Sequence, residues 1–115
     1  MDKENGAVDN ATIMALREDG SLLRELRDLF ASEAPEQLQR MLNGYRLRDC
    51  STVAQAAHRL KGTAVTFGAE GMQRICIEIE GQARKGALDG VERKMRDLSA
   101  ECDRVLVALD AAIGA

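Results

Sequence analysis

The segment AHRLKG, residues 57–62, contains the only histidine in this chain of 115 residues. A neutral imidazole is a nucleophile, and its charge changes near physiological pH. Lys61 lies about one helical turn after His58, and Gly62 follows it. A cation suits phosphoryl oxygens, and a glycine leaves room for a bulky partner beside the ring. These residues indicate a phosphoryl acceptor, while a structural histidine and a glycine that permits close helix packing stay open as alternatives.

Glu80 is the side chain that we expect opposite His58. If two helices pack around a tight turn centred near Ala69, His58 and Glu80 lie at equal separations from that centre (69 − 58 = 80 − 69 = 11). The same count places Arg84 one turn further along the second helix. A carboxylate that accepts the Nδ1 proton fixes the tautomer and leaves the Nε2 lone pair free. Lys61 and Arg84 would then place positive charge near that nitrogen.

Helical spacing of apolar residues begins close to the N-terminus. The segment DNATIMALRED predicts a short helix with Asp9 or Asn10 as its cap. A second apolar stripe extends over residues 23–45 and contains Pro35. Because the stripe resumes in phase after the proline, we expect one kinked helix here rather than two separate ones.

Three further amphipathic segments complete the pattern. Residues 49–52 supply helix-start signals, and the last of them forms a capping-box pattern with Gln55 in a helix that ends near Phe67. The next two segments cover residues 72–83 and 91–112, with short connections between them. Four long amphipathic helices plus a short N-terminal one predict an all-α fold, an antiparallel four-helix bundle.

The composition narrows the class of protein further. Apolar residues make up 45% of the chain, and the 16 basic and 19 acidic residues are interspersed along it, with a net charge of −3. This pattern argues against nucleic acid as a partner, and the apolar runs are too short to span a membrane. The first residues contain no apolar signal region. We therefore expect a cytoplasmic protein in which Cys76 and Cys102, at apolar helical positions, are reduced core residues.

Catalytic machinery of other kinds is missing from the sequence. The chain has no glycine-rich phosphate loop, no kinase-type nucleotide signature and no second histidine for a di-metal bundle. His58 would therefore have to receive its phosphoryl group from a partner that brings the metal and the chemistry.

At these residues the sequence resembles the histidine-phosphotransfer (HPt) domain family of multistep phosphorelays. The resemblance is carried by AAHRLKGTAVTFGAEGMQRICIEIEGQARKG, with the core A-H-x-L-K-G followed six residues later by G-A, and it covers about residues 20–87. It implies that His58 is the phosphorylated histidine. Lys61 and Gly62 match the family's basic residue and access glycine. Glu80 matches a Glu or Gln bonded to the histidine, and Arg84 matches a further basic residue found in some relatives.

The resemblance implies a phosphorelay intermediate rather than an autonomous enzyme. A receiver domain carrying an aspartyl phosphate would dock beside His58, and a second receiver would later remove the group. Mg²⁺ is expected on the receiver, so this chain needs no cofactor of its own. We divide the chain into a flexible tail, residues 1–8, and an HPt-type domain, residues 9–115. The domain would be free-standing or part of a hybrid sensor histidine kinase.

Two other functions stay open at this stage. The chain would also fit the phosphoacceptor domain of a chemotaxis-type histidine kinase, which is phosphorylated from ATP by an attached catalytic domain. A helical adaptor whose histidine is never modified is the alternative from another class. For a docking surface, the apolar candidates are Ile13, Leu16, Leu22 and Val65, each of which would equally suit the core.

Overall fold

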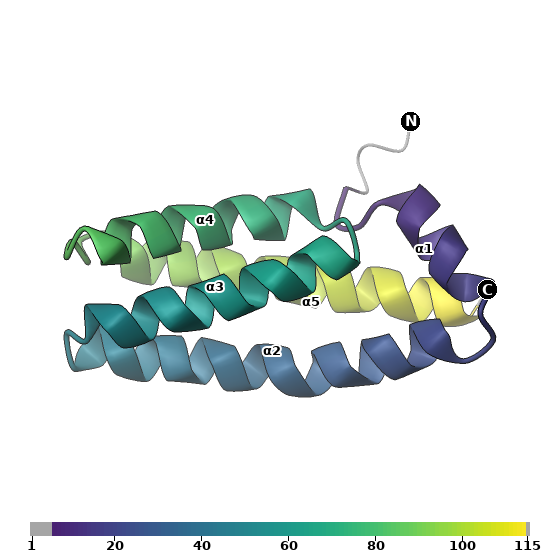
Figure 1. Ribbon diagram of the computed structural model, residues 1–115, viewed down its shortest axis with the longest axis horizontal. Helices are drawn as coiled ribbons and strands as arrows, with labels where there is room; N and C mark the ends of the chain where they lie inside the picture. Colours follow the sequence, from purple (N-terminus) through teal and green to yellow (C-terminus); the bar gives the residue numbers. More distant parts are fainter. Residues whose placement is uncertain (1–5, 115) are drawn as a thin grey trace.

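The computed structural model describes residues 6–114 and contains five α-helices and no strand in that range. They are α1 (Asn10–Arg17), α2 (Leu22–Arg46), α3 (Cys50–Thr66), α4 (Glu70–Arg84) and α5 (Val91–Gly114). The four long helices lie side by side, and α1 packs against α2 and α5 near one end (Figure 1). Among the described residues, no helix combines the length and apolar content that crossing a bilayer requires. The prediction of an all-α fold is confirmed.

The second helix contains a proline without being divided by it. α2 extends over 25 residues and includes Pro35 in its interior. Proline removes one backbone hydrogen bond, but the apolar stripe on either side stays on one face and packs as a single surface. The prediction of one helix rather than two is therefore confirmed.

Aspartate side chains begin two of the helices. The Asp9 carboxylate caps α1 by accepting from the backbone N–H of Thr12 at 2.9 Å. Asp49 caps α3 and accepts from both the backbone N–H of Thr52, at 3.2 Å, and its hydroxyl, at 2.7 Å. The predicted capping box between Thr52 and Gln55 is therefore wrong. The earlier aspartate is an equally strong cap and takes the donors that begin the helix.

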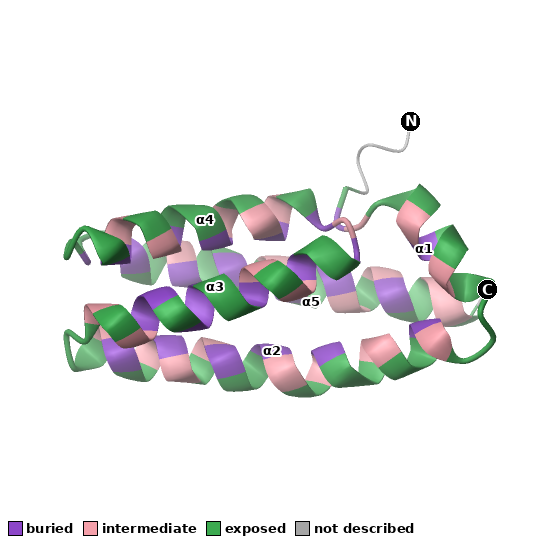
Figure 2. Cartoon of the chain, viewed as in Figure 1, coloured by how far each residue is buried: buried purple, intermediate pink, exposed green. Residues whose placement is uncertain are grey.

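The core lies between the inward faces of the long helices, and each contributes buried side chains to it (Figure 2). Phe30 of α2 and Phe67 at the end of α3 meet edge to face, with ring centroids 5.8 Å apart. Cys76 and Cys102 are buried as predicted, and burial raises the pKa of each thiol to about 12. Buried apolar side chains line the packed faces of α3 and α4: Val53, Ala57, Leu60, Ala64, Met72, Cys76, Ile79 and Ala83.

The turn between α3 and α4 is also the place where the N-terminal segment packs. Gly68 has φ +62°, in the left-handed region, and the Phe67 carbonyl accepts from the Asp9 N–H at 3.0 Å. Residues 1–5 of the predicted flexible tail lie outside the described residues. Within the rest of that tail, Ala7 is only 3% exposed and Val8 packs against the core. The packed chain therefore begins before Asp9, because apolar residues that precede the cap reach the core.

Replacing Gly68 by alanine should destabilise the protein. The new Cβ would clash with the Asp9 side chain, and alanine disfavours the positive φ. We expect the free energy of unfolding to fall by about 1–3 kcal/mol. Gly86→Ala is the matched control, since Gly86 has φ +77° but open space around its Cβ position. Urea unfolding would compare the two variants, and equal losses would contradict the close packing of the N-terminal segment.

Candidate functional site

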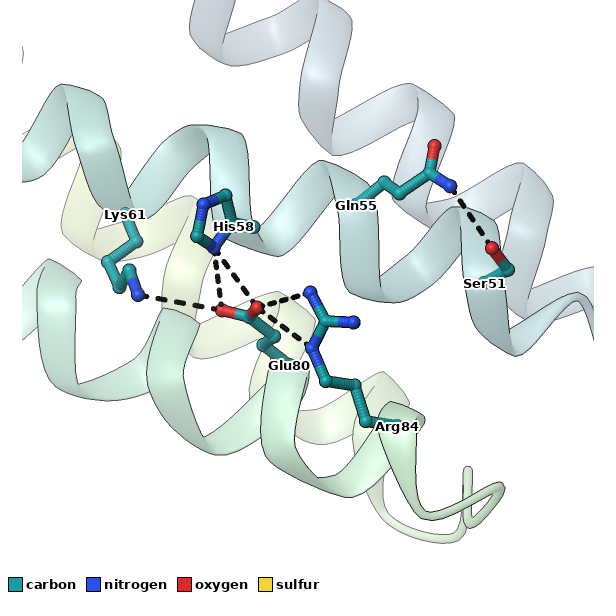
Figure 3. A network of polar contacts seen from close by, with 6 residues as sticks. All are labelled: Ser51, Gln55, His58, Lys61, Glu80 and Arg84. Atoms are coloured by element: carbon teal, nitrogen blue, oxygen red, sulfur yellow. Dashed lines mark hydrogen bonds and ion pairs between the residues drawn. The ribbon is translucent and has the colours of Figure 1, made fainter.

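His58 and Glu80 meet between α3 and α4. The His58 Nδ1 atom lies 3.1 Å and 3.3 Å from the two carboxylate oxygens of Glu80 (Figure 3). The imidazole is 59% exposed, whereas the Glu80 side chain is only 12% exposed. Figure 3 shows the second ring nitrogen, Nε2, on the side of the ring away from Glu80. The pairing predicted by counting from the turn is confirmed, and the ring presents one free nitrogen to solvent.

The carboxylate determines which tautomer His58 adopts. Burial of the Glu80 carboxyl favours its neutral form, but the hydrogen bond from Arg84 and the charges of His58 and Lys61 outweigh that effect. The net result is a pKa of Glu80 below its ordinary value. An ionised carboxylate only accepts hydrogen bonds, so the proton of a neutral His58 ring resides on Nδ1. Nε2 then carries the lone pair and can act as the nucleophile.

Lys61 and Arg84 both bind the Glu80 carboxylate. Arg84 donates from Nε at 3.0 Å and from a terminal nitrogen at 2.7 Å to the same oxygen, and Lys61 Nζ lies 3.8 Å from the other oxygen. The sequence placed these two cations near Nε2. The structure instead joins them to the carboxylate behind the ring, because Glu80 is the acceptor both long side chains reach. Figure 3 shows both cations and His58 converging on Glu80.

Gly62 leaves open space above α3. A Cβ built at Gly62 would meet no atom within 4 Å apart from its own stretch of helix. Close packing against a neighbouring helix, which was one of the two explanations for this glycine, is therefore wrong. Gly81, the residue after Glu80 on α4, is equally unobstructed and was not identified from the sequence. The signal was present, since Gly81 is also a glycine inside a strongly helical segment.

Polar contacts on the other side of α3 were also missed. Glu33 of α2 accepts from Arg59 Nε at 2.7 Å and from the Thr63 hydroxyl at 3.3 Å, which ties α2 to α3. One turn before His58, Gln55 donates to the Ser51 hydroxyl at 3.1 Å (Figure 3). No spacing in the sequence predicts the Glu33 contacts, because they depend on how α2 and α3 align.

The four apolar docking candidates are divided between core and surface. Ile13 is buried in the core and Leu16 packs against it, while Leu22 is half-buried. Val65 is 58% exposed and lies on α3 about two turns after His58. Ile77 of α4, which was not among the candidates, is 54% exposed. Exposed apolar side chains therefore lie on both helices that form the site.

The structure also bears on metal binding. Within residues 6–114, no group of three or more His, Cys, Asp or Glu side chains is arranged to hold a metal ion. The side chains at the site are one imidazole, one carboxylate and two cations. An imidazole nitrogen can act as a nucleophile here, and the nearby cations favour an anionic group bonded to it.

Comparisons with known proteins agree with this geometry. No curated protein matches the sequence. The chain is similar in structure to histidine-containing phosphotransfer protein B from Pseudomonas aeruginosa PAO1, with a TM-score of 0.84 and 23% identity over 90% of this chain and 91% of that one. At this identity the likeness shows the fold. The model of the Hpt domain matches residues 25–108, which is most of the sequence, and the chain therefore belongs to the Hpt domain family.

Proposed function

We propose that His58 accepts a phosphoryl group from the aspartyl phosphate of a receiver domain and passes it to a second receiver. The chain thereby acts as a histidine phosphotransfer protein in a two-component phosphorelay, the role of the Hpt family. One observation carries the assignment to His58: its Nδ1 is held by a carboxylate, while Nε2 is free and exposed. No other imidazole exists in the chain.

The transfer step follows from this arrangement. The Nε2 lone pair attacks phosphorus in line, the N–P bond forms, and the P–O bond to the receiver's aspartate breaks to release its carboxylate. The ring becomes a cation that keeps its Nδ1 proton, and the Glu80 carboxylate 3.1 Å away stabilises that charge. Transfer to the second receiver reverses these bond changes. The receiver contributes the acidic residues and the Mg²⁺ that it requires.

The supporting residues have separate roles in this proposal. Glu80 orients the ring, and Gly62 leaves room for the receiver. Lys61 and Arg84 hold Glu80, and the net positive charge of these two cations and one carboxylate favours phosphoryl oxygens on the neighbouring ring. These ion pairs also neutralise the largely buried Glu80 carboxylate. Their place beside His58 supports a role in phosphoryl handling as well.

The same proposal covers the finer architecture and setting of the chain. Short connections and the packing of each long helix on its sequence neighbour support an antiparallel four-helix bundle with α1 at one end. We infer a carrier without catalytic activity of its own, acting in the cytoplasm as a free-standing protein or within a hybrid histidine kinase. The phosphotransfer unit is taken as residues 9–115, preceded by the packed residues Ala7 and Val8.

His58→Gln should abolish phosphorylation and leave the fold intact. The side chain is mostly exposed, so its replacement removes no core packing. Incubation with a phosphorylated receiver, followed by intact mass, should show one acid-labile, base-stable phosphate on the wild type and none on the variant. Label on the variant would contradict the assignment. Labelling of the wild type only by a kinase domain with ATP would favour the chemotaxis-type alternative, and no label from either donor would favour an adaptor.

Glu80→Ala should slow phosphotransfer without ending it. The ring loses the acceptor that orients it, and we expect a loss of about tenfold or more in rate. Glu80→Gln is the matched control, because its amide oxygen still accepts from Nδ1 and should preserve more of the rate. A transfer time course with one receiver would compare the three proteins, and a wild-type rate in Glu80→Ala would remove Glu80 from the mechanism.

Gly62→Ala should stabilise the protein by about 1 kcal/mol, because alanine is the better helix former and its Cβ meets nothing. Gly62→Gln should stay folded but project beside His58 and slow transfer from the receiver. Thermal melts and transfer rates would be measured on both variants. Marked destabilisation of both, with transfer retained, would show that Gly62 serves packing instead of access.

A further inference from the structure

Glycines inside the helices fall into two groups. A helix interior favours alanine over glycine by about 1 kcal/mol, so each such glycine calls for a reason. Gly44 has one, because a Cβ there would lie 3.1 Å from the Thr52 side chain of α3, and at Gly71 a Cβ would displace the flexible end of the Glu101 side chain. Gly62 and Gly81 have none, since a Cβ at either meets no atom within 4 Å. Packing inside the chain therefore does not explain these two.

Gly81 lies on the outward face of α4 beside the phosphoacceptor. It follows the core-facing Ile79 by two residues, a rotation of about 200°, which places it roughly opposite the buried face of α4. The α5 side of α4 is marked by Gln82, whose oxygen accepts from Lys94 at 3.0 Å. Gly81 shares the outward face with Ile77, one turn earlier and 54% exposed. The two unexplained glycines thus lie on the two helices that hold His58 and Glu80.

A small phosphoryl donor needs access only to Nε2, which Gly62 on α3 already provides. Bare backbone on the neighbouring helix is useful only to a partner whose surface spans both helices. Val65 and Ile77 offer such a partner apolar contact, and Lys61 and Arg84 offer positive charge. A receiver domain, with carboxylates around its aspartyl phosphate, has the complementary charge.

We propose that Gly81 is a second contact point for the receiver, where the partner's surface rests on the exposed backbone of α4 while its phosphoryl group reaches His58. This inference rests on the proposed function, since the receiver is the occupant. A side chain at Gly81 would hold the receiver away from α4 and lengthen the distance between phosphorus and Nε2.

Gly81→Gln tests this contact with two donors of different size. One is the phosphorylated receiver. The other is phosphoramidate, whose P–N bond breaks and releases ammonia as the imidazole takes the phosphoryl group. Transfer from the receiver should fall by about tenfold or more, because small misplacements of reacting atoms are costly. Labelling of His58 by phosphoramidate should equal that of the wild type, and the melting temperature should not fall.

Ala100→Gln is the matched control. It places the same side chain at an exposed position in the middle of α5, which within the described residues does not contact α3. Receiver transfer should be unchanged in this variant. Three results would contradict the proposed contact at Gly81. They are an unchanged rate of receiver transfer in Gly81→Gln, slower labelling of that variant by both donors, and unfolding of the variant. A wild type that phosphorylated receivers never label would instead overturn the proposed function and, with it, this inference.

Discussion

The site depends on one largely buried carboxylate. Glu80 is 12% exposed and accepts from His58 on one side and from Arg84 on the other, with Lys61 close by. A buried charge is costly unless it is paired, and three cationic or donor groups supply the pairing. They hold its pKa down, so the carboxylate stays ionised and keeps the imidazole proton on Nδ1. The free Nε2 lone pair is the consequence, and with it the nucleophile.

The packing of α3 against α4 determines where the Glu80 carboxylate lies. Ala57, Leu60 and Ala64 of α3 and Cys76 and Ile79 of α4 are all buried in the core, and α3 and α4 pack closely against each other. Apolar burial and the short turn after Phe67 set the alignment of the two helices. The polar pair lies one residue beyond this seam on each helix. Core packing thus stabilises the fold and positions the site, while the outward faces stay free for a partner.

Stability and function are separated around His58. The ion pairs of Glu80 offset the cost of its burial, whereas Gly62 weakens its helix without relieving any contact with another part of the chain. Elsewhere on the molecule glycine has a structural purpose, as at Gly68, where the backbone is left-handed and Asp9 approaches closely. A glycine that opposes helix stability therefore lies beside His58, as expected at a functional site.

The sequence by itself determined the helices, the single α2 through Pro35 and the pairing of His58 with Glu80. Helical periodicity and a short turn are local constraints, and counting outward from the turn is enough to align neighbouring helices. Only the tertiary structure decided that Lys61 and Arg84 bind Glu80 and that Ala7 packs with the core. Long side chains such as those of Lys61 and Arg84 can adopt many rotamers, and contacts between distant segments depend on how the helices assemble. A local sequence pattern therefore predicts neither the rotamer nor the distant contact.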